Sequence, residues 1–303
     1  MKIAVVYQGA LGDTVLLASL LVSLRARWPT AERALVTRRS FGSLMIKLGV
    51  AELAFDADDP NHSAWFGPDQ TSTGYFESDG SLPWTNSDLL LSAVSSGHDA
   101  WAAHARRACR RARMLFFEPR PPPHYSGHVT SFHRQELGAL RLLPPVLVGG
   151  RQHRHGPLVI QPGSGGREKC WPLENFMRLA RAVNQAKIPV EFLLGEVELE
   201  RFGHRDLARL EREFVVRRDI PLAQVADLLG VSRAYLGNDS GISHLAAWIG
   251  IPVVVIFGPS NARQWRPVGP QVRVYQSGVN FGTAYGADEE FLQVLNLVLE
   301  VCG

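Results

Sequence analysis

The feature of this sequence that most constrains its fold is an alternation of strand-like and helix-like segments that occurs twice. Short apolar runs with the composition of buried strands include KIAVVY near the start and PVVVIFG near the end. Between such runs, apolar residues recur at helical spacing, as in residues 14–28 and 173–186. Strands that alternate with helices form a parallel sheet covered on both faces. The pattern therefore predicts an α/β fold.

A segment without hydrophobic periodicity separates the two series. Its sequence, PPVLVGGRQHRHGP at residues 144–157, is rich in proline, glycine and basic side chains, which is typical of a domain boundary. A chain of 303 residues also has the length of two ordinary domains. We expect two Rossmann-like domains, residues 1–150 and 151–303, with parallel sheets that face a central cleft. The amphipathic segment at 288–301 is then the closing helix, either within the second domain or packed back on the first.

Residues 58–87 interrupt the alternation in the first half. This segment is rich in proline, glycine, serine, asparagine and aspartate. Loops of this length without secondary structure are uncommon in compact domains. We therefore expect a long irregular insertion in the first domain, whose role the sequence does not assign.

Composition argues against several other classes of protein. No apolar run approaches the roughly 20 residues needed to cross a bilayer, and the first residues lack the features of a signal peptide. Cys109, Cys170 and Cys302 are odd in number and lack ligand-like spacing, so we expect free thiols in a cytoplasmic protein, not a disulfide or zinc site. The net charge of +3 is too small to favour nucleic acid as a partner.

The first strand runs into a glycine loop in the stretch VYQGALGDTVLLASLL. Such a loop before a helix is a common phosphate site, yet Gly9 and Gly12 are not spaced as in the dinucleotide fingerprint. The loop also ends in Asp13, and a fixed carboxylate at a helix N-terminus competes with a bound phosphate. Asp13 is therefore either the N-cap of the helix or a functional group that acts on something other than phosphate.

The second half contains a glycine-rich loop followed by a lysine, PGSGGREKCWP. Gly163, Gly165 and Gly166 allow the backbone to approach an anion closely, and successive amides can form an anion-binding nest. Lys169 adds a positive charge within reach. The alternative is a flexible turn with a solvated lysine, and the spacing is not that of a P-loop.

A further motif, YLGNDSGISHLAAWIG, predicts a strand followed by a helix that starts near Gly241. Asp239 and Ser240 then stand at the helix N-terminus, where amide groups can bind phosphate oxygens. His244 follows Ser240 by four positions and shares its face of the helix. The alternative is that Asp239 or Ser240 only caps the helix and that His244 packs into the sheet.

Together these segments resemble family 9 glycosyltransferases, the bacterial heptosyltransferases of lipopolysaccharide core synthesis. The resemblance is carried by PGSGGREKCWPLENF and by LGNDSGISHLAAWIGIPVVVIFGPSNARQWRPVG. The opening GALGDTVLLASLL resembles the N-terminal loop and first helix of that family. The resemblance implies a GT-B fold and a sugar transfer with inversion at the anomeric carbon. It also implies no metal and no cofactor beyond a nucleotide-sugar co-substrate, ADP-heptose.

The resemblance also implies roles for individual residues. Lys169 would neutralise the leaving diphosphate, and Asp13, beside Gly12, would act as the base that removes the acceptor's hydroxyl proton. The residues expected to bind the sugar donor are Gly163, Ser164, Lys169, Asp239, Ser240, Gly241 and His244. A glutamate after the strand VEFLLG would bind the ribose, and the candidates are Glu196, Glu198 and Glu200. Of these we select Glu198.

The stretch RRACRRAR places five arginines on a predicted helix: Arg106, Arg107, Arg110, Arg111 and Arg113. Charge runs are usually solvated faces. The alternative is an anionic partner, either a phosphorylated, lipid-linked saccharide acceptor or an acidic membrane surface. In that case Arg106 and Arg110 bind the acceptor together with Gly12 and Asp13. The protein would then be peripheral on the cytoplasmic face of the inner membrane.

Two rival functions fit a two-domain nucleotide-sugar protein. One is an isomerase similar to nucleotide-sugar 2-epimerases, and the other is a non-catalytic nucleotide-sugar-binding protein. The carboxylate of Asp13 and the segment Lys169–Pro172 favour transfer over both. A dehydrogenase is disfavoured, because neither half shows the G-x-G-x-x-G fingerprint with an acidic residue about 20 positions on.

Overall fold

The computed structural model describes residues 1–59, 84–145, 155–277, 281 and 288–303. The chain divides into two compact units, Met1–Pro145 and Val146–Gly303. Most of the expected insertion at 58–87 and most of the segment at 144–157 lie outside the described residues.

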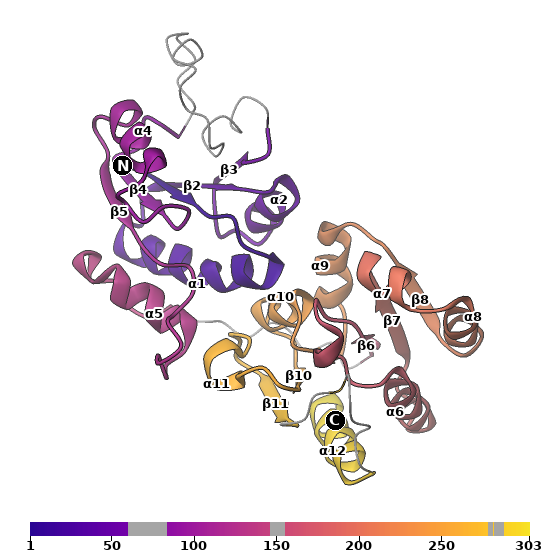
Figure 1. The fold of residues 1–303 in the computed structure, drawn as a ribbon. Coiled ribbons are helices and arrows are strands. Elements are labelled where there is room, and N and C mark those ends of the chain that lie inside the picture. Colours follow the sequence, from indigo (N-terminus) through magenta and orange to yellow (C-terminus); the bar gives the residue numbers. More distant parts are fainter. Residues whose placement is uncertain (60–83, 146–154, 278–280, 282–287) are drawn as a thin grey trace. The chain divides into compact units, whose positions relative to one another are not determined.

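The first unit contains a five-stranded parallel sheet in the order β3-β2-β1-β4-β5. Its strands are β1 (Lys2–Val6), β2 (Glu32–Thr37), β3 (Leu53–Asp56), β4 (Leu89–Ser92) and β5 (Arg113–Phe116). Its helices are α1 (Leu11–Arg27), α2 (Arg39–Lys47), α4 (Ala100–Ala108), α5 (Val129–Glu136) and the 3-10 helix η1 (Gly138–Leu140). Helices α1 and α5 pack together on one face of the sheet, and α4 covers the other (Figure 1).

The strands of the first unit are apolar because both faces of the sheet are buried. Val6 and Leu90 pack against Trp101 of helix α4 in one core cluster. On the other side, Leu17 and Leu21 of helix α1 are fully buried. Helix α1 is thus an interior element, and its position after β1 is fixed by packing.

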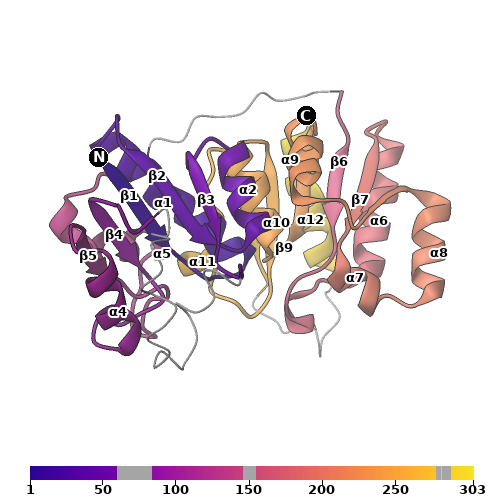
Figure 2. The same cartoon turned by 90° about the horizontal axis from the view of Figure 1, so that it is seen from above.

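The second unit contains a six-stranded parallel sheet in the order β11-β10-β9-β6-β7-β8. Figure 2 labels three neighbouring strands of this sheet, β9, β6 and β7. Its strands are β6 (Leu158–Gln161), β7 (Val190–Leu194), β8 (Val215–Arg218), β9 (Ala234–Asn238), β10 (Val253–Phe257) and β11 (Val272–Gln276). Its helices are η2 (Arg167–Lys169), α6 (Leu173–Gln185), α7 (Glu196–Arg201), α8 (His204–Glu213), α9 (Leu222–Gly230), α10 (Gly241–Ile249), α11 (Ala262–Trp265) and α12 (Asp288–Cys302).

Helices cover both faces of this second sheet. Helices α9 and α10 pack together on one face, and α6 and α12 pack together on the other. Val294 and Val298 of α12 share a core cluster with Phe176 of α6 and with Leu236 and Ile256 of the sheet. The buried face of helix α12 therefore packs in the core of the second unit.

The predicted α/β class with two parallel sheets is confirmed, but three details of the sequence prediction are wrong. Residues 196–214 have the pattern of a single helix, but the structure has two helices, α7 and α8, because Phe202 and Gly203 adopt extended backbone between them. The short helix α11 and the strand β11 were not predicted. Strand β11, with the sequence VRVYQ, is an edge strand that is only half-buried, so it lacks the apolar run that marks an interior strand.

The third wrong detail is the helix expected near residues 98–113. Asp99 caps helix α4 by accepting a hydrogen bond from Ala102 N, and the helix ends at Ala108. Only Arg106 and Arg107 of the basic run are helical, and Arg113 begins β5. The five arginines therefore do not share one helical face.

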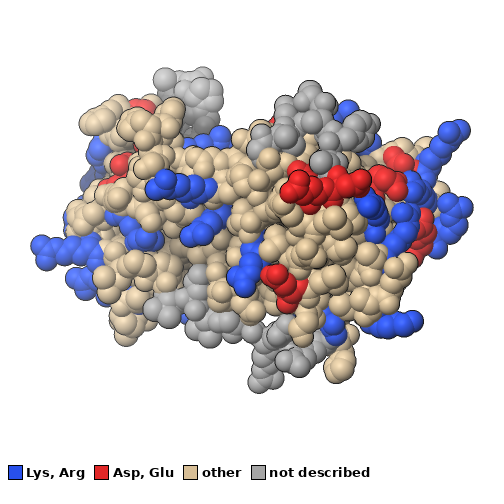
Figure 3. Space-filling view, turned by 90° about the horizontal axis from the view of Figure 1, so that it is seen from below, with Lys and Arg blue, Asp and Glu red and all other residues tan. Residues whose placement is uncertain are grey.

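Acidic and basic side chains lie next to one another on the face of the second unit that Figure 3 displays. Two ion pairs between α6 and α8 join Arg181 to Glu213 at 2.7 Å and Arg209 to Glu174 at 2.6 Å. Exposed ion pairs of this kind are typical of a protein surface that faces solvent. Among the described residues, no helix is both long and apolar enough to span a bilayer.

Candidate functional site

The strand order of each sheet reverses at one point, and four of the sequence-predicted residues lie there: Asp13, Lys169, Asp239 and Ser240. The reversal falls between β1 and β4 in the first unit and between β6 and β9 in the second. Ligands of open α/β sheets bind outside the carboxyl ends of the strands at such switch points. Asp13 follows β1, the loop at 163–169 follows β6, and Asp239 and Ser240 follow β9. Each unit therefore brings its candidates to the position where ligands bind in this class of fold.

Asp239 connects the loop after β6 to the loop after β9. Its Oδ2 accepts hydrogen bonds from Lys169 Nζ and from Ser260 Oγ, both at 2.8 Å. Its backbone carbonyl accepts a hydrogen bond from Ser164 Oγ at 2.6 Å. The Asp239 side chain is 9% exposed and that of Lys169 is 34% exposed. The buried carboxylate thus orients an ammonium group that has three N–H groups and still reaches solvent.

The loop that carries Lys169 is anchored to the end of β9 by Asn238. The backbone N–H of Trp171 donates to Asn238 Oδ1 at 3.0 Å, and Asn238 Nδ2 donates to the Pro162 carbonyl at 2.8 Å. One buried amide therefore holds both ends of the loop.

Arg201 holds the middle of the same loop. Its Nη1 donates to the Ser164 carbonyl and its Nη2 to the Gly165 carbonyl, each at 2.7 Å. A trans peptide points its N–H opposite to its C=O. The N–H groups of Gly165 and Gly166 therefore point away from Arg201.

Ser240 is the N-cap of helix α10. Its Oγ accepts from Ser243 N at 3.3 Å and donates to Gln161 Oε1 at 2.8 Å. The capping interpretation of Ser240 is confirmed, and it is compatible with phosphate binding, because the N–H of Gly241 has no carbonyl partner within the helix. His244 is buried in the first turns of α10.

The buried phenol of Tyr235 and the hydroxyl of Ser240 share one hydrogen-bond acceptor, the side-chain oxygen of Gln161. Tyr235 OH donates to Gln161 Oε1 at 3.2 Å. Burial raises the pKa of Tyr235, so the phenol stays protonated and remains a hydrogen-bond donor. The Gln161 carbonyl oxygen is thereby fixed toward Ser240.

Glu198 is the one of the three candidate glutamates that is buried; Glu196 and Glu200 are exposed. Its Oε2 accepts from Gly195 N at 2.8 Å, and its Oε1 accepts from Gln161 Nε2. A Cβ at Gly163 would collide with this carboxylate, so a larger residue there would displace the Glu198 side chain. Glu198 therefore lies against the loop after β6.

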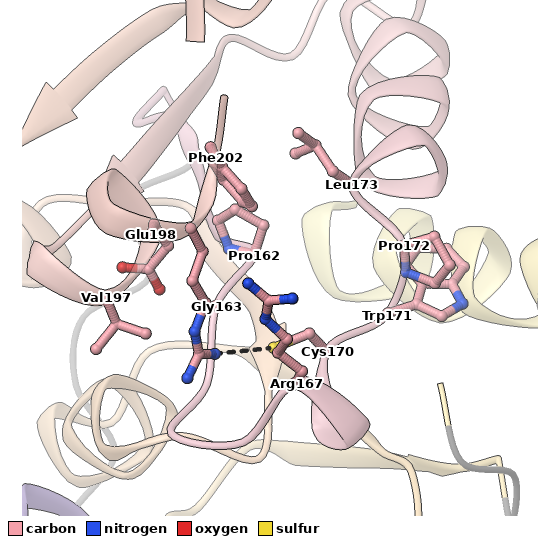
Figure 4. A pocket seen from close by; sticks show the side chains of 11 residues that line it. Pro162, Gly163, Arg167, Cys170, Trp171, Pro172, Leu173, Val197, Glu198 and Phe202 are labelled. Atoms are coloured by element: carbon pink, nitrogen blue, oxygen red, sulfur yellow. Dashed lines mark hydrogen bonds between the residues drawn. The ribbon is translucent and has the colours of Figure 1, made fainter. Parts of the chain in front are cut away.

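Glu198 also lines a cavity of about 240 Å³ in the second unit (Figure 4). Its other walls are largely apolar and include Trp171, Leu173 and Phe202, with Arg167 at its edge. An apolar hollow with a few polar groups is the usual form of a small-molecule site.

In the first unit, Asp13 lies in the first turn of helix α1 and not at its cap. The N-cap is Ala10, which has extended backbone, and no side chain caps the helix. The N-cap interpretation of Asp13 is therefore wrong: the helix begins at Leu11, before Gly12. The carboxylate is 18% exposed and lies 3.6 Å from the guanidinium of Arg120, which is 74% exposed.

Two neighbours fix the surroundings of Asp13. A Cβ at Gly9 would meet the Tyr7 ring and the Cβ of Asp13, so glycine lets the strand end approach the helix start. Burial, and secondarily the Asp13 carboxylate, raise the pKa of Tyr7. The neighbouring phenol is therefore neutral and does not take up protons in place of Asp13.

His133 of helix α5 supports the segment that carries Arg120. Its Nε2 lies 2.9 Å from the Pro119 carbonyl, which can only accept, so Nε2 carries the proton. Burial lowers the pKa of His133, opposed by this hydrogen bond and by Asp13. The sequence assigned His133 no role.

The two predicted acceptor-binding arginines have contacts of their own. Arg106 donates to the Gly97 carbonyl at 2.8 Å and lies 5.3 Å from the Phe116 ring centre. Arg110 Nε donates to the Arg107 carbonyl at 3.3 Å. None of the ion pairs in the described residues joins either to Asp13, so their acceptor role stays a prediction.

Several residues of these sites were missed from the sequence: Arg120, Gln161, Asn238, Arg201 and Ser260. Gln161 and Asn238 are polar residues at the ends of apolar strands, and this was a usable signal. Arg120 follows β5, and only the strand order reveals that β5 lies next to β4, which in turn pairs with β1.

A metal-ligand set would be a further signal of function. In the described part of the chain, no three His, Cys, Asp or Glu side chains gather as one. Metal independence of the reaction stays a prediction.

Comparison with known proteins identifies similar chains. The sequence profile of the family described as glycosyltransferase family 9 (heptosyltransferase) matches residues 122–286. Lipopolysaccharide heptosyltransferase 1 of Pseudomonas aeruginosa is 35% identical over 165 residues, which is 54% of this chain and 42% of that protein. The chain thus matches less than half the length of this relative.

Solved structures match along nearly the whole chain. The Escherichia coli ADP-heptose lipopolysaccharide heptosyltransferase II has a TM-score of 0.73 at 18% identity, covering 100% of this chain and 98% of that one. The E. coli heptosyltransferase WaaC with ADP has a TM-score of 0.72 at 16% identity, covering 99% and 100%. These likenesses confirm the expected GT-B fold.

Proposed function

The chain belongs to glycosyltransferase family 9, the heptosyltransferase family, and we propose that it transfers heptose from ADP-heptose to a saccharide of the lipopolysaccharide core. The observation that carries this proposal is the placement of Lys169 and Asp239 at the switch point of the second sheet, next to the N-terminus of helix α10. Such an arrangement of one ammonium and helix amides suits a diphosphate.

The proposed reaction is an inverting displacement without a required metal. The acceptor hydroxyl oxygen attacks the anomeric carbon while the bond from that carbon to the diphosphate oxygen breaks. The electron pair leaves with ADP, and the hydroxyl proton passes to the carboxylate of Asp13. A positioned base of this kind contributes a factor of about 10²–10⁴ to the rate.

In this proposal, the second unit stabilises the negative charge that develops on the leaving diphosphate. Lys169 would neutralise it, while the amides near Gly165 and Gly241 donate hydrogen bonds. Fixed donors act strongly on developing charge because they do not reorganise during the reaction. The anchoring of this loop by Asn238 and Arg201 supports that assignment.

We assign the nucleoside to the surroundings of Glu198. Glu198 is buried and lines the cavity, which favours Glu198 over Glu196 and Glu200 as the residue that binds the ribose. A carboxylate oxygen accepts more than one hydrogen bond, so contacts with Gln161 and Gly195 leave capacity for a ribose hydroxyl.

The acceptor is proposed to be anionic and lipid-linked, with contact at the inner membrane surface. The exposed arginines Arg110 and Arg111, together with Arg120 beside Asp13, support this. Sedimentation with anionic and neutral liposomes tests it, comparing the wild type with an Arg110→Ala/Arg111→Ala double variant. Equal sedimentation in all four combinations contradicts the membrane contact.

The activity is tested by incubating the purified protein with ADP-heptose and core oligosaccharide acceptors. We expect an acceptor heavier by one heptose residue in the mass spectrum and release of ADP. A changed donor sugar in the absence of acceptor would instead identify an epimerase. Binding without either product would identify a nucleotide-sugar-binding protein.

The donor is tested separately by thermal shift with ADP, UDP and GDP, because a ligand that binds the native state raises its melting temperature. Stabilisation by ADP is expected. Stabilisation by UDP alone would contradict ADP-heptose as donor.

A further inference from the structure

A buried carboxylate on the C-terminal helix contacts the loop that carries Lys169. Glu290 lies in the first turn of helix α12 and is buried. Its Oε1 accepts a hydrogen bond from Trp171 Nε1 at 2.6 Å, and its Oε2 accepts one from Ser277 Oγ. Residues 119 positions apart are thus joined by a charge-assisted hydrogen bond.

The indole of Trp171 is held in one orientation by its neighbours. It is 1% exposed and packs edge-on against Phe176, with ring centres 5.1 Å apart and planes at 87°. It stacks on Phe291 of helix α12, with planes at 15°. Its N–H therefore has a fixed direction, and that direction is toward Glu290.

Trp171 transmits this anchoring to the candidate donor site. It lies two positions after Lys169, and its backbone N–H donates to Asn238, the residue before Asp239. A second contact from the same end of the chain reaches the loop, since Phe281 N donates to the Glu168 carbonyl at 3.1 Å. The loop at 167–171 is therefore bound on one side to β9 and on the other to the C-terminal segment.

We propose that Glu290 is a positioning residue for sugar-donor binding, which acts by fixing Trp171 and thereby the place of Lys169 beside Asp239. This inference rests on the proposed donor role of Lys169. Without the carboxylate, the buried indole N–H loses its acceptor, and a buried polar group in that state is costly. The loop then relieves the cost by moving Trp171, which carries Lys169 away from Asp239.

The test compares four variants by calorimetric titration with ADP. Glu290→Leu removes the acceptor at similar volume, and Trp171→Phe removes the indole N–H while keeping an aromatic ring. Glu290→Gln keeps an acceptor for Trp171 and a donor for Ser277. Val298→Ala is the matched control, because Val298 is fully buried on the same helix and its truncation only weakens packing.

We expect Glu290→Leu and Trp171→Phe to weaken ADP binding by about tenfold, since each disrupts one buried charge-assisted hydrogen bond. Glu290→Gln and Val298→Ala should stay within about twofold of the wild type, although Val298→Ala lowers the melting temperature. In turnover assays Glu290→Leu should raise the KM for the sugar donor and also lower kcat, because the displaced Lys169 both binds the diphosphate and neutralises the charge that develops on it. Trypsin should also cleave native Glu290→Leu after Lys169 faster than the wild type.

The outcomes separate this inference from the proposed function. If Lys169→Ala loses ADP affinity while Trp171→Phe and Glu290→Leu bind as the wild type does, the positioning role is wrong and the donor site stands. If Lys169→Ala binds ADP normally, the donor site itself is wrong. Equal loss of affinity in Val298→Ala would reduce Glu290 to a general contribution to stability and overturn its specific role. Should Glu290→Leu fail to fold, Trp171→Phe decides the question.

Discussion

Lys169 and Asp239, which are 70 positions apart in the sequence, form an ion pair of 2.8 Å at the switch point of the second sheet. The pair joins the loop after β6 to the start of the loop after β9, and Ser260 donates to the same carboxylate oxygen. The sequence predicted Lys169 and Asp239 from two separate motifs, and the structure shows that Asp239 orients Lys169. The two motifs form one site.

Replacing Lys169 by alanine should weaken ADP binding by about 10- to 100-fold, the range expected for one hydrogen bond to a charged group. The fold should be kept, because the Lys169 side chain is partly exposed. Calorimetric titration measures the affinity. Arg205→Ala, at an exposed site on helix α8, is the matched control and should bind ADP as the wild type does.

Asp13→Asn should lower heptose transfer by a factor of about 10²–10⁴ and leave ADP affinity unchanged. The amide keeps the size of the side chain but does not take up the hydroxyl proton. Initial rates with saturating substrates measure the first effect, and ADP titration measures the second. Near-normal turnover in this variant would remove Asp13 from the mechanism.

Arg120→Ala should reduce turnover without altering ADP affinity, because Arg120 pairs with Asp13 and is remote in sequence from the donor motifs. The guanidinium is 74% exposed, so the ion pair itself is worth at most about 1 kcal/mol. The expected loss is therefore smaller than for Asp13→Asn. Arg141→Ala is unsuitable as a control, since Arg141 has left-handed backbone. Arg27→Ala at the exposed end of helix α1 is suitable.

The sequence predicted the parts of these sites that depend on local pattern. Gly163, Lys169, Asp239 and Ser240 stand where a strand ends and a helix begins, and both boundaries are visible as a change of hydrophobic period. The start of helix α1 was misplaced by three residues, because Ala10 is not a recognisable N-cap.

Contacts that depend on topology were not predictable in this way. Arg120 meets Asp13 because β5 lies on the same side of β1 as β4 does, and no local pattern encodes strand order. Glu290 meets Trp171 because helix α12 returns to the face covered by α6. Acidic residues are common in the first turn of a helix, so the sequence alone did not distinguish Glu290 from its acidic neighbours.

Thiol labelling should distinguish Cys170 from the other two cysteines. Burial raises the pKa of Cys109 and of Cys302 to about 11 in each case, so both are protonated and shielded near neutral pH. Burial also raises the pKa of Cys170, but the positive charge of Arg201 opposes this and the side chain is only half-buried. We expect one reactive thiol per native chain and three after unfolding in urea.

The Cys170→Ser variant identifies the reactive thiol, since native labelling should then vanish. Because Cys170 follows Lys169 directly, bound ADP should slow its labelling under the proposed function. Native labelling of two thiols would contradict the burial of Cys109 or Cys302.

The stability of the first unit should decrease in weak acid because of His133. In the unfolded chain a histidine titrates at about pH 6.5, whereas burial lowers the pKa of His133 in the folded protein. Below about pH 6.5 the unfolded chain therefore binds a proton that the native state resists. The contribution of His133 to the free energy of unfolding is therefore constant above that pH and falls as the pH drops toward the folded pKa.

The slope contributed by one histidine is at most about 1.4 kcal/mol per pH unit. His104 acts in the same direction, because burial lowers its pKa as well. Urea unfolding at about pH 7.5, 6.5 and 5.5 measures the effect across the range in which histidine titrates. His133→Phe should be less stable at every pH, since the hydrogen bond to Pro119 is lost, yet its stability should fall less steeply in acid. A His104→Phe/His133→Phe variant should flatten the profile further, and a slope equal to that of the wild type would show that neither buried imidazole controls the acid response.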